Sequence, residues 1–237
     1  MKLPTSTTLE SLFTKTNSYN SKREYSVEYS RFFMTFGQSN NSTMKKLVFA
    51  TNNKHKLAEV RAILKNQFEV YSLAEIDCHD DIPETADTLE GNAEQKANWV
   101  LEKYGYDCFA DDSGLEIDAL EGRPGVYSAR YAGENCSFDD NNKKVLKELE
   151  GIENRKAKFR TVICLKLNGE TKFFAGEVKG NITNEYKGNK GFGYDPIFVP
   201  DDFSKSFAEM GDDLKNSMSH RYHATQQLVK FLRSLSK

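Results

Sequence analysis

The segment Lys46-Leu-Val-Phe-Ala-Thr51 is a short apolar run, typical of a buried β-strand. A polar loop, residues 52–55, follows it, and apolar side chains then recur at helical spacing over residues 57–64. A helix that begins after a strand points backbone N–H groups at anions near its first turn, and Lys54 and Lys56 add positive charge there. The pattern predicts a phosphate-binding turn, although many α/β proteins begin in this way without binding phosphate.

The rest of the chain alternates between strand-like and helix-like patterns. Apolar or alternating runs predict strands at 68–73, 108–110, 115–119, 159–167 and 172–178, and helical periodicity predicts helices at about 87–104, 138–149 and 219–235. Asp87 and Glu90 have the spacing of a capping box, Gly105 suits a helix end, and Asn168-Gly169 suits a hairpin turn. We expect one mixed α/β unit, arranged as two lobes with a cleft between them.

Bulk composition narrows the class of protein. The 237 residues include 38% hydrophobic and 29% charged residues, as in an ordinary globular protein with a buried core. A formal net charge of −2 provides no basic field, so we expect no nucleic-acid partner. No apolar run approaches the roughly 20 residues needed to cross a bilayer, so we expect no membrane partner. The four cysteines lack metal-binding spacing, which favours free thiols and a cytoplasmic location.

Residues 1–43 differ from the rest of the chain. They are rich in Ser, Thr, Asn and Tyr and show no apolar period, so we expect a largely disordered N-terminal extension, with the domain in residues 44–237. The extension lacks the apolar stretch of a secretory signal. Its Arg and Ser content fits a transit peptide, but Glu10, Glu24 and Glu28 argue against one, and a true start at Met44 is a simpler alternative.

The sequence Asp111-Asp112-Ser113-Gly114 directly follows one of the predicted strands. Two adjacent carboxylates repel each other unless a cation or a strong donor compensates. Glu84, in an acidic loop, is a candidate third oxygen ligand, and Mg²⁺ commonly takes one or two carboxylates together with substrate phosphates. The pattern favours a metal site; the alternative is an Asx-turn with solvated acids.

A second unusual string is Gly191-Phe192-Gly193-Tyr194-Asp195-Pro196. Its two glycines let the backbone approach a flat ligand, Phe192 or Tyr194 can stack on that ligand, and Asp195 can accept hydrogen bonds. A structural turn that packs both aromatic rings into the core is the alternative.

The last predicted helix opens with Ser219-His220-Arg221. His220 and Arg221 can donate hydrogen bonds to a base carbonyl or to a phosphate. Helix starts also carry such residues without any binding role, so the string alone leaves both readings open.

Taken together, these segments resemble the inosine triphosphate pyrophosphatases, also called dITP/XTP pyrophosphatases. The matching segments are Ala50-Thr51-Asn52-Asn53-Lys54-His55-Lys56, Asp111-Asp112-Ser113-Gly114-Leu115, the segment from Gly122-Arg123-Pro124 through Ala129-Arg130-Tyr131, residues 191–197, and Lys215-Asn216-Ser217-Met218-Ser219-His220-Arg221. The resemblance implies an α/β fold with a long central mixed β-sheet and flanking helices, two lobes around a nucleotide-binding cleft, and usually a homodimer. Asn52 and Gly91 depart from the pattern, since many members carry glycine and an acid there.

The resemblance also implies roles for individual residues. Glu84 and Asp112 bind Mg²⁺, for which Mn²⁺ can substitute; Asp111 supports this metal site, and Asp112 is also the general base. The residues implied to bind substrate are Thr51, Asn52, Asn53, Lys54, His55 and Lys56 at the triphosphate, Lys96, Ser113 and Lys215 along the nucleotide, and Phe192, Gly193, Tyr194, Asp195, His220 and Arg221 around the base.

The implied activity is Mg²⁺-dependent hydrolysis of ITP, dITP and XTP to the monophosphate and pyrophosphate, which removes non-standard purines from the nucleotide pool. Water activated by Asp112 attacks the α-phosphorus, and pyrophosphate leaves. A pyrophosphatase for pyrimidine or modified nucleotides is one alternative, against which the base-pocket segments argue. A nucleotide- or RNA-binding module without turnover is another, and its carboxylates would hinder phosphate binding unless metal were present.

Overall fold

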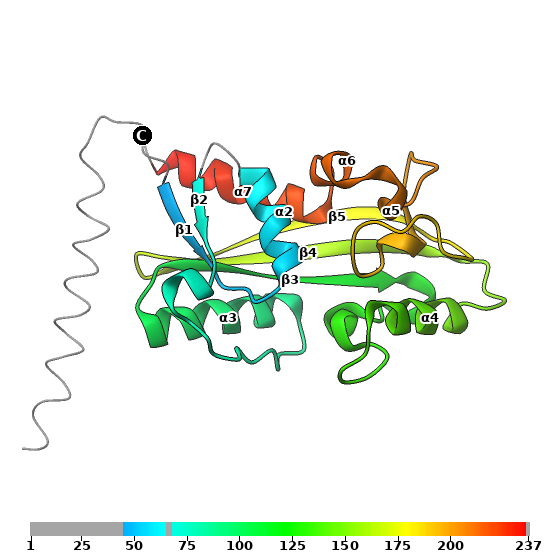
Figure 1. The fold of residues 1–237 in the computed structure, drawn as a ribbon, viewed down its shortest axis with the longest axis horizontal. Coiled ribbons are helices and arrows are strands. Elements are labelled where there is room, and N and C mark those ends of the chain that lie inside the picture. Colours follow the sequence, from blue (N-terminus) through cyan, green and yellow to red (C-terminus); the bar gives the residue numbers. More distant parts are fainter. Residues whose placement is uncertain (1–44, 65–67, 236–237) are drawn as a thin grey trace, which may run out of the picture. The chain divides into compact units, whose positions relative to one another are not determined.

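A mixed β-sheet forms the centre of the protein, with strand order β2-β1-β3-β4-β5-β6 (Figure 1). The computed structural model describes residues 45–64 and 68–235, so the expectation for residues 1–43 lies outside the described part of the chain. The strands are β1 (Lys45–Phe49), β2 (Phe68–Tyr71), β3 (Cys108–Ile117), β4 (Lys156–Leu167), β5 (Glu170–Ile182) and β6 (Phe198–Pro200). β1 pairs in parallel with β2 and β3, and the pairs from β3 to β6 are antiparallel. The predicted mixed sheet with flanking helices is confirmed.

Helices cover both faces of this sheet (Figure 1). α2 (Lys54–Leu64) and α7 (His220–Ser234) lie on one face, and α3 (Leu89–Tyr104) and α4 (Phe138–Glu148) lie on the other. The short elements are α5 (Phe207–Met210), α6 (Asp212–Asn216), and the 3₁₀ turns η2 (Ala74–Ile76), η3 (Asp118–Leu120), η4 (Gly125–Arg130) and η5 (Asp195–Ile197). None of the helices within 45–64 and 68–235 has the length and apolarity needed to span a bilayer.

Strand β3 is longer than the sequence pattern predicts. We expected separate strands at 108–110 and 115–119, but residues 111–114 join them in one continuous strand that ends at Ile117. β4 pairs with the whole of β3, and it places Ile163 opposite Asp111 and Val162 opposite Asp112. Because successive side chains of a strand point to opposite faces of a sheet, the two adjacent aspartates face different helical layers.

Helix α3 also begins differently from the expectation. Thr88 is its N-cap, with Oγ1 accepting a hydrogen bond from the Gly91 N–H at 3.0 Å, so the capping box expected from Asp87 and Glu90 is wrong. The helix begins one residue later because a Thr hydroxyl satisfies one of its first free N–H groups. Gly105 ends the helix at a φ of 73°, as predicted.

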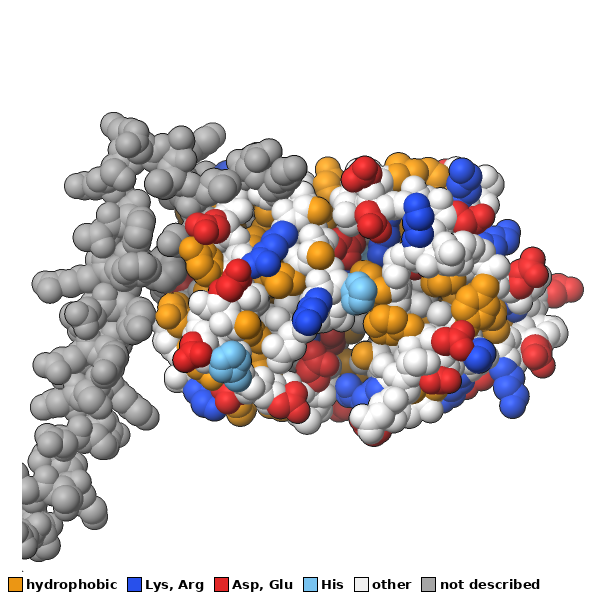
Figure 2. Space-filling model, in the orientation of Figure 1, with side chains coloured by type: hydrophobic (Ala, Val, Ile, Leu, Met, Phe, Trp, Pro, Cys, Tyr) orange, Lys and Arg blue, Asp and Glu red, His pale blue; other side chains and the backbone are white. Residues whose placement is uncertain are grey.

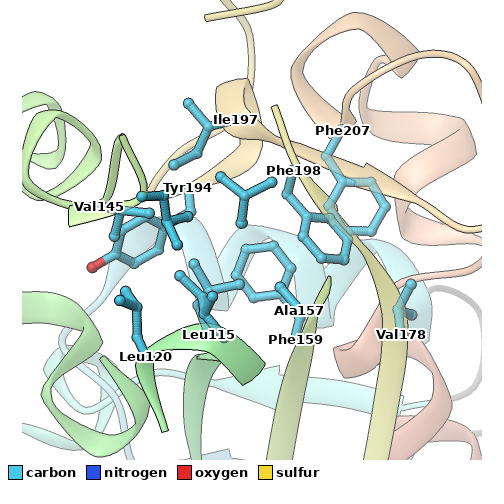
Figure 3. Packing of buried hydrophobic residues seen from close by; sticks show 13 residues of the cluster. Leu115, Leu120, Val145, Ala157, Phe159, Val178, Tyr194, Ile197, Phe198 and Phe207 are labelled. Atoms are coloured by element: carbon cyan, nitrogen blue, oxygen red, sulfur yellow. The ribbon is translucent and has the colours of Figure 1, made fainter. Parts of the chain in front are cut away.

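The apolar core divides into three clusters of buried side chains. The first lies beside α2 and α7 and includes Phe49 and Leu228, and the second lies beside α3 and includes Val100. The third, drawn in Figure 3, lies near α4 and β6 and includes Val145 and Tyr194. Along β3, the polar residues 111–114 separate members of the first two clusters from members of the third. The centre of the sheet therefore lies between two separately packed halves.

A glycine in β5 sets how closely α7 packs on the sheet. A Cβ atom added at Gly176 would stand 2.3 Å from the His220 carbonyl oxygen and 2.4 Å from the Ala224 nitrogen, both backbone atoms of α7. Such contacts are far inside van der Waals distance, so only glycine permits this approach. The first turn of α7 thereby lies directly against the sheet.

Candidate active site

Acidic side chains gather in a recess near the centre of the face shown in Figure 2, between the half that carries α3 and the half that carries α4. The polar residues 111–114 of β3 lie between the corresponding packed clusters. The residues around this stretch come from α2, α3, α7 and the loops that precede them, so the sheet gathers segments that are distant in the sequence.

Asp111 lies on the face of β3 toward α2 and α7. Its Oδ1 accepts a hydrogen bond from Lys56 Nζ at 3.1 Å, and its Oδ2 accepts one from Arg221 Nε at 3.0 Å. Burial opposes ionisation of this carboxyl, but the charges of Lys56, Arg221 and Lys96 outweigh burial and hold its pKa well below the usual value. Asp111 is therefore ionised and held by two cations.

Arg221 extends this ionic network to a second buried acid. Its Nη1 donates to Glu59, its Nη2 donates to Ser113 Oγ at 3.1 Å, and Glu59 Oε1 also accepts a hydrogen bond from Ser219 Oγ at 3.0 Å. Glu59 is 5% exposed, and we did not single it out from the sequence. The only sequence signal is its position three residues after Lys56, which places both side chains on one face of α2.

Asp112 lies on the opposite face of β3, toward α3. Its Oδ2 accepts a hydrogen bond from Asn92 Nδ2 at 3.1 Å, and its Oδ1 lies 3.6 Å from Lys96 Nζ and 4.0 Å from Lys56 Nζ. Lys96 Nζ also donates to Glu84, so two carboxylates share one buried ammonium group. Burial raises the pKa of Asp112, and the charges of Lys96 and Lys56 offset that rise only in part.

The carboxylates of Glu84, Asp111 and Asp112 differ in how well they could bind a divalent cation. Within the described residues, no group of three or more His, Cys, Asp or Glu side chains is arranged to hold a metal ion. Glu84 and Asp112 nevertheless face the same cation, the Lys96 ammonium, so this pair already surrounds a position that favours positive charge. Two carboxylates fit Mg²⁺ when substrate phosphates supply further oxygens. Both oxygens of Asp111, in contrast, are taken by Lys56 and Arg221.

The predicted phosphate-binding loop is fixed by its own side chains. Thr51 Oγ1 accepts a hydrogen bond from the Asn53 N–H at 3.2 Å. Asn53 Oδ1 in turn accepts from the N–H groups of His55 at 3.0 Å and Lys56 at 3.1 Å. Asn53 therefore occupies two of the N–H groups that we expected to face an anion, and Lys56 Nζ is the charge that the loop directs at the centre. The remaining loop residues, Asn52 and Lys54, are exposed.

The loop at residues 191–195 places an aromatic ring beside a buried lysine. Asp195 Oδ2 accepts hydrogen bonds from the Phe192 N–H and from Lys215 Nζ, both at 2.8 Å. Lys215 Nζ lies 4.4 Å from the centroid of the Phe192 ring. The structure thus brings together Phe192, Asp195 and Lys215, three of the residues that we expected at the nucleotide.

The two aromatic residues of this loop have different surroundings. Tyr194 is 4% exposed and belongs to the core cluster in Figure 3, and its hydroxyl donates to the Ser128 carbonyl at 2.9 Å. Phe192 is only partly buried. Asn142, which sequence reasoning missed, donates from Nδ2 to the Gly193 carbonyl at 2.9 Å and fixes the loop between the two rings.

His220, the first residue of α7, is buried. Its ring stacks on Phe159 with centroids 4.7 Å apart, and its Nδ1 has no hydrogen-bond partner among the described residues. Burial holds its pKa well below the usual value, and the charges of Arg221 and Lys215 add to this effect. His220 is therefore neutral near pH 7, with a ring nitrogen that is unpaired.

Known proteins are similar to this chain over the part that contains the candidate site. The sequence profile of the Ham1 family matches residues 47–231. A dITP/XTP pyrophosphatase of Flavobacterium johnsoniae is 57% identical over 79% of this chain and 97% of its own length, and one of Flavobacterium psychrophilum is 52% identical over 80% and 100%. The structure of the Staphylococcus aureus Ham1 protein is 39% identical, covers 81% of this chain and all of its own, and superposes with a TM-score of 0.73.

The chain belongs to the Ham1 family. It is an enzyme of the pyrophosphatase class that these relatives represent, and the resemblance inferred from the sequence is confirmed.

Proposed function

We propose that the protein hydrolyses the non-standard purine nucleoside triphosphates dITP, XTP and ITP to the monophosphate and pyrophosphate. The names of the related proteins support the first two substrates. The observation that carries the proposal is the placement of Asp112, whose carboxylate lies at the centre of the sheet within 4.0 Å of both Lys56 Nζ and Lys96 Nζ. A carboxylate with a raised pKa beside two ammonium groups suits proton transfer next to a polyanion.

The reaction follows from these side chains. Asp112 accepts the proton of a water molecule whose oxygen attacks the α-phosphorus, and the bond from that phosphorus to the bridging oxygen of pyrophosphate breaks. Lys56 and Lys96 neutralise charge that develops on the phosphates. Glu84 and Asp112 would hold Mg²⁺, which when bound supplies positive charge beside the phosphoryl group. Asp111 orients Lys56 through its 3.1 Å hydrogen bond.

Recognition of the base is proposed at Phe192 and Lys215. Phe192 offers a partly buried aromatic ring at this place, and the Lys215 ammonium nitrogen lies 4.4 Å from its centroid. Hypoxanthine and xanthine present a 6-carbonyl acceptor, whereas adenine presents an amino donor there. A pocket of buried donors would leave adenine unpaired, and such a mismatch can be worth up to ~10⁴-fold in discrimination.

We propose a different role for Arg221 from the base contact that the sequence led us to expect. Its three guanidinium nitrogens donate to Asp111, Glu59 and Ser113, and the side chain is 1% exposed. A guanidinium has five N–H groups, so any contact with a base must use the two that remain. We assign Arg221 mainly to the support of Asp111, and His220 to the wall of the base pocket.

The test is a measurement of pyrophosphate release from dITP, XTP, ITP, dTTP and ATP, with Mg²⁺ and with EDTA. We expect rapid release from the first three substrates, slow release from ATP, and none in EDTA. Preferential cleavage of dTTP would support the rival reading of a pyrimidine-nucleotide pyrophosphatase, and tight binding without release would support a binding module.

Three further expectations accompany this function. We propose that the protein forms a homodimer, acts in the cytoplasm, and does not require residues 1–43 for activity. Light scattering on the purified protein tests the first, and comparison of the full chain with one that starts at Met44 tests the third. A chain starting at Met44 that lost activity would place a functional segment in the extension.

A further inference from the structure

Three rings from separate segments meet at the edge of the proposed base pocket. His55, in the first turn of α2, stacks on Phe192 with centroids 5.0 Å apart and an interplanar angle of 19°. Phe138, the first residue of α4, lies 6.2 Å from Phe192 and 6.2 Å from His55. We refer to these three residues as the aromatic cluster.

Phe192 lies between a buried cationic side and an exposed aromatic side. Lys215 Nζ and Arg221 Cζ lie 4.4 and 6.0 Å from its ring centroid, and these side chains belong to residues that are 4% and 1% exposed. Phe138, in contrast, is 44% exposed, and His55 is also exposed. His55 and Phe138 therefore contact Phe192 from the solvent side, away from the buried lysine.

Asp195 and Asn142 fix the backbone of this loop, and the Phe192 ring itself is held by the side chains around it. Gly191 and Gly193 flank it at φ values of 75° and 63°, a region that favours glycine, and neither has a side chain that could contact the ring. A binding pocket loses affinity for its ligand if a ring in its wall has to be ordered on binding. Contacts from His55 and Phe138 reduce that cost by holding the ring in place beforehand.

His55 also links the ring to the other end of the site. Its backbone N–H donates to Asn53 Oδ1, and the next residue, Lys56, donates to Asp111. The stack on Phe192 therefore joins the loop expected to hold the triphosphate to the loop expected to hold the base.

We propose that His55 and Phe138 are positioning residues for base binding, which support the outer side of the Phe192 ring by stacking. This inference rests on the proposed function. It also differs from the sequence-based expectation for His55, because a residue that holds the triphosphate acts through charge or hydrogen bonding, whereas a stacking residue acts through its flat ring.

The two roles are separated by substitutions of His55. His55→Phe keeps a flat ring and removes both nitrogens, His55→Gln keeps hydrogen bonding without a ring, and His55→Ala removes both. We expect His55→Ala and His55→Gln to raise KM for dITP by about 2- to 10-fold, the range for loss of one aromatic pair, with kcat within about 2-fold. His55→Phe should remain close to the wild type.

Phe138→Ala tests the second ring. We expect a rise in KM of about 2-fold or more, because its two ring contacts are longer than the His55–Phe192 stack. Matched controls are His79→Ala, an exposed histidine paired with Asp77, and Phe173→Ala, a phenylalanine with 45% exposure; neither should change KM. Thermal melting of every variant confirms that it is folded.

Product inhibition provides a readout that a general structural defect would not reproduce. In His55→Ala, inhibition by the monophosphate dIMP should weaken by the same factor as KM, and inhibition by pyrophosphate should be unchanged. The opposite pattern, or a His55→Phe variant as impaired as His55→Ala, would overturn the inference and assign His55 to the phosphates. If the wild-type protein hydrolyses dITP and His55→Ala matches it, only this inference fails. If the wild type hydrolyses neither dITP nor XTP, the proposed function fails and this inference with it.

Discussion

The two neighbouring carboxylates of β3, which lie on opposite faces of the sheet, differ in their ion-pair partners and in the direction of their pKa shifts. On the face toward α2 and α7, Asp111 is bound by two cations, and its pKa is held low. On the face toward α3, Asp112 shares Lys96 with Glu84, and burial raises its pKa. Asp111, whose negative charge is neutralised by two cations, is suited to supporting the site. Asp112, whose charge is only partly neutralised, can still take up a proton or bind a metal ion. The more fully neutralised carboxylate thus lies on one face of β3 and the less fully neutralised one on the other, and Lys56 lies within 4.0 Å of both.

Asp111→Asn tests the structural role assigned to the carboxylate on the face toward α2 and α7. The substitution leaves the buried Arg221 guanidinium with one acidic partner instead of two, and breaking a buried ion pair typically costs about 3–5 kcal/mol. We expect the free energy of unfolding, measured by urea denaturation, to fall by about that amount. A matched Asp112→Asn variant should not show this loss. Equal losses in both variants would show that the two faces are equivalent.

Asp112→Asn should produce the complementary result. It preserves size and removes the base, so kcat for dITP should fall by at least ~10²-fold, within the range for general-base catalysis. Because burial disfavours the charged form of Asp112, the neutral amide should leave the thermal midpoint nearly unchanged. Steady-state kinetics and thermal melting test both parts, and an active Asp112→Asn enzyme would remove Asp112 from the mechanism.

Glu84→Gln sharpens the assignment of the metal to the face of β3 toward α3. If Glu84 and Asp112 hold Mg²⁺, the concentration of Mg²⁺ needed for half-maximal activity should rise by at least ~10-fold. Titration of EDTA-treated enzyme with Mg²⁺ measures this value. Glu59→Gln, on the α2 side, serves as the control and should leave the Mg²⁺ requirement unchanged once its folding is verified. A shift in the Glu59→Gln variant alone would move the metal to the other face.

The smallest expected effect concerns His220, on the same side as Asp111. Its pKa is lowered in the folded protein, so below pH ~6.5 the unfolded chain binds a proton that the folded protein excludes, and stability falls as the pH falls. His220→Phe keeps the stack on Phe159 and removes this titration. At pH ~5.5 the wild type should therefore lose about 1 kcal/mol more than the variant, relative to pH 7.5. Identical pH profiles in urea denaturation would contradict a buried neutral His220.

Local sequence patterns predicted most of the elements but not the continuity of β3. Periodicity located the helices near residues 87–104, 138–149 and 219–235, because each buries one apolar face. Asp, Ser and Gly disfavour strands, so residues 111–114 resembled a turn. Pairing with β4 overrides that preference, and β4 lies about fifty residues further along the chain. No local pattern contains that information.

The candidate site shows the same division between local and distant information. Lys56, Glu84 and Asp112 could be named from local sequence features and Lys96 from the family resemblance, and the structure brings them together. Glu59 could not be named, since an acidic residue in a helix is expected to be exposed to solvent. Its buried partner, Arg221, lies 162 residues further along the chain. The separation of Phe192 from Tyr194 was also invisible, because either ring could have entered the core.

The pairing of β3 with β4 has a consequence for how this chain tolerates insertions and deletions. A slip of one residue between these strands would exchange the faces of Asp111 and Asp112 and would give the reactive position to the wrong carboxylate. Length changes inside either strand should therefore abolish activity even when the fold survives. Length changes at the Asn168-Gly169 turn leave that alignment intact and should be tolerated far better. The identity of the catalytic acid is, in this sense, a property of strand alignment as much as of residue type.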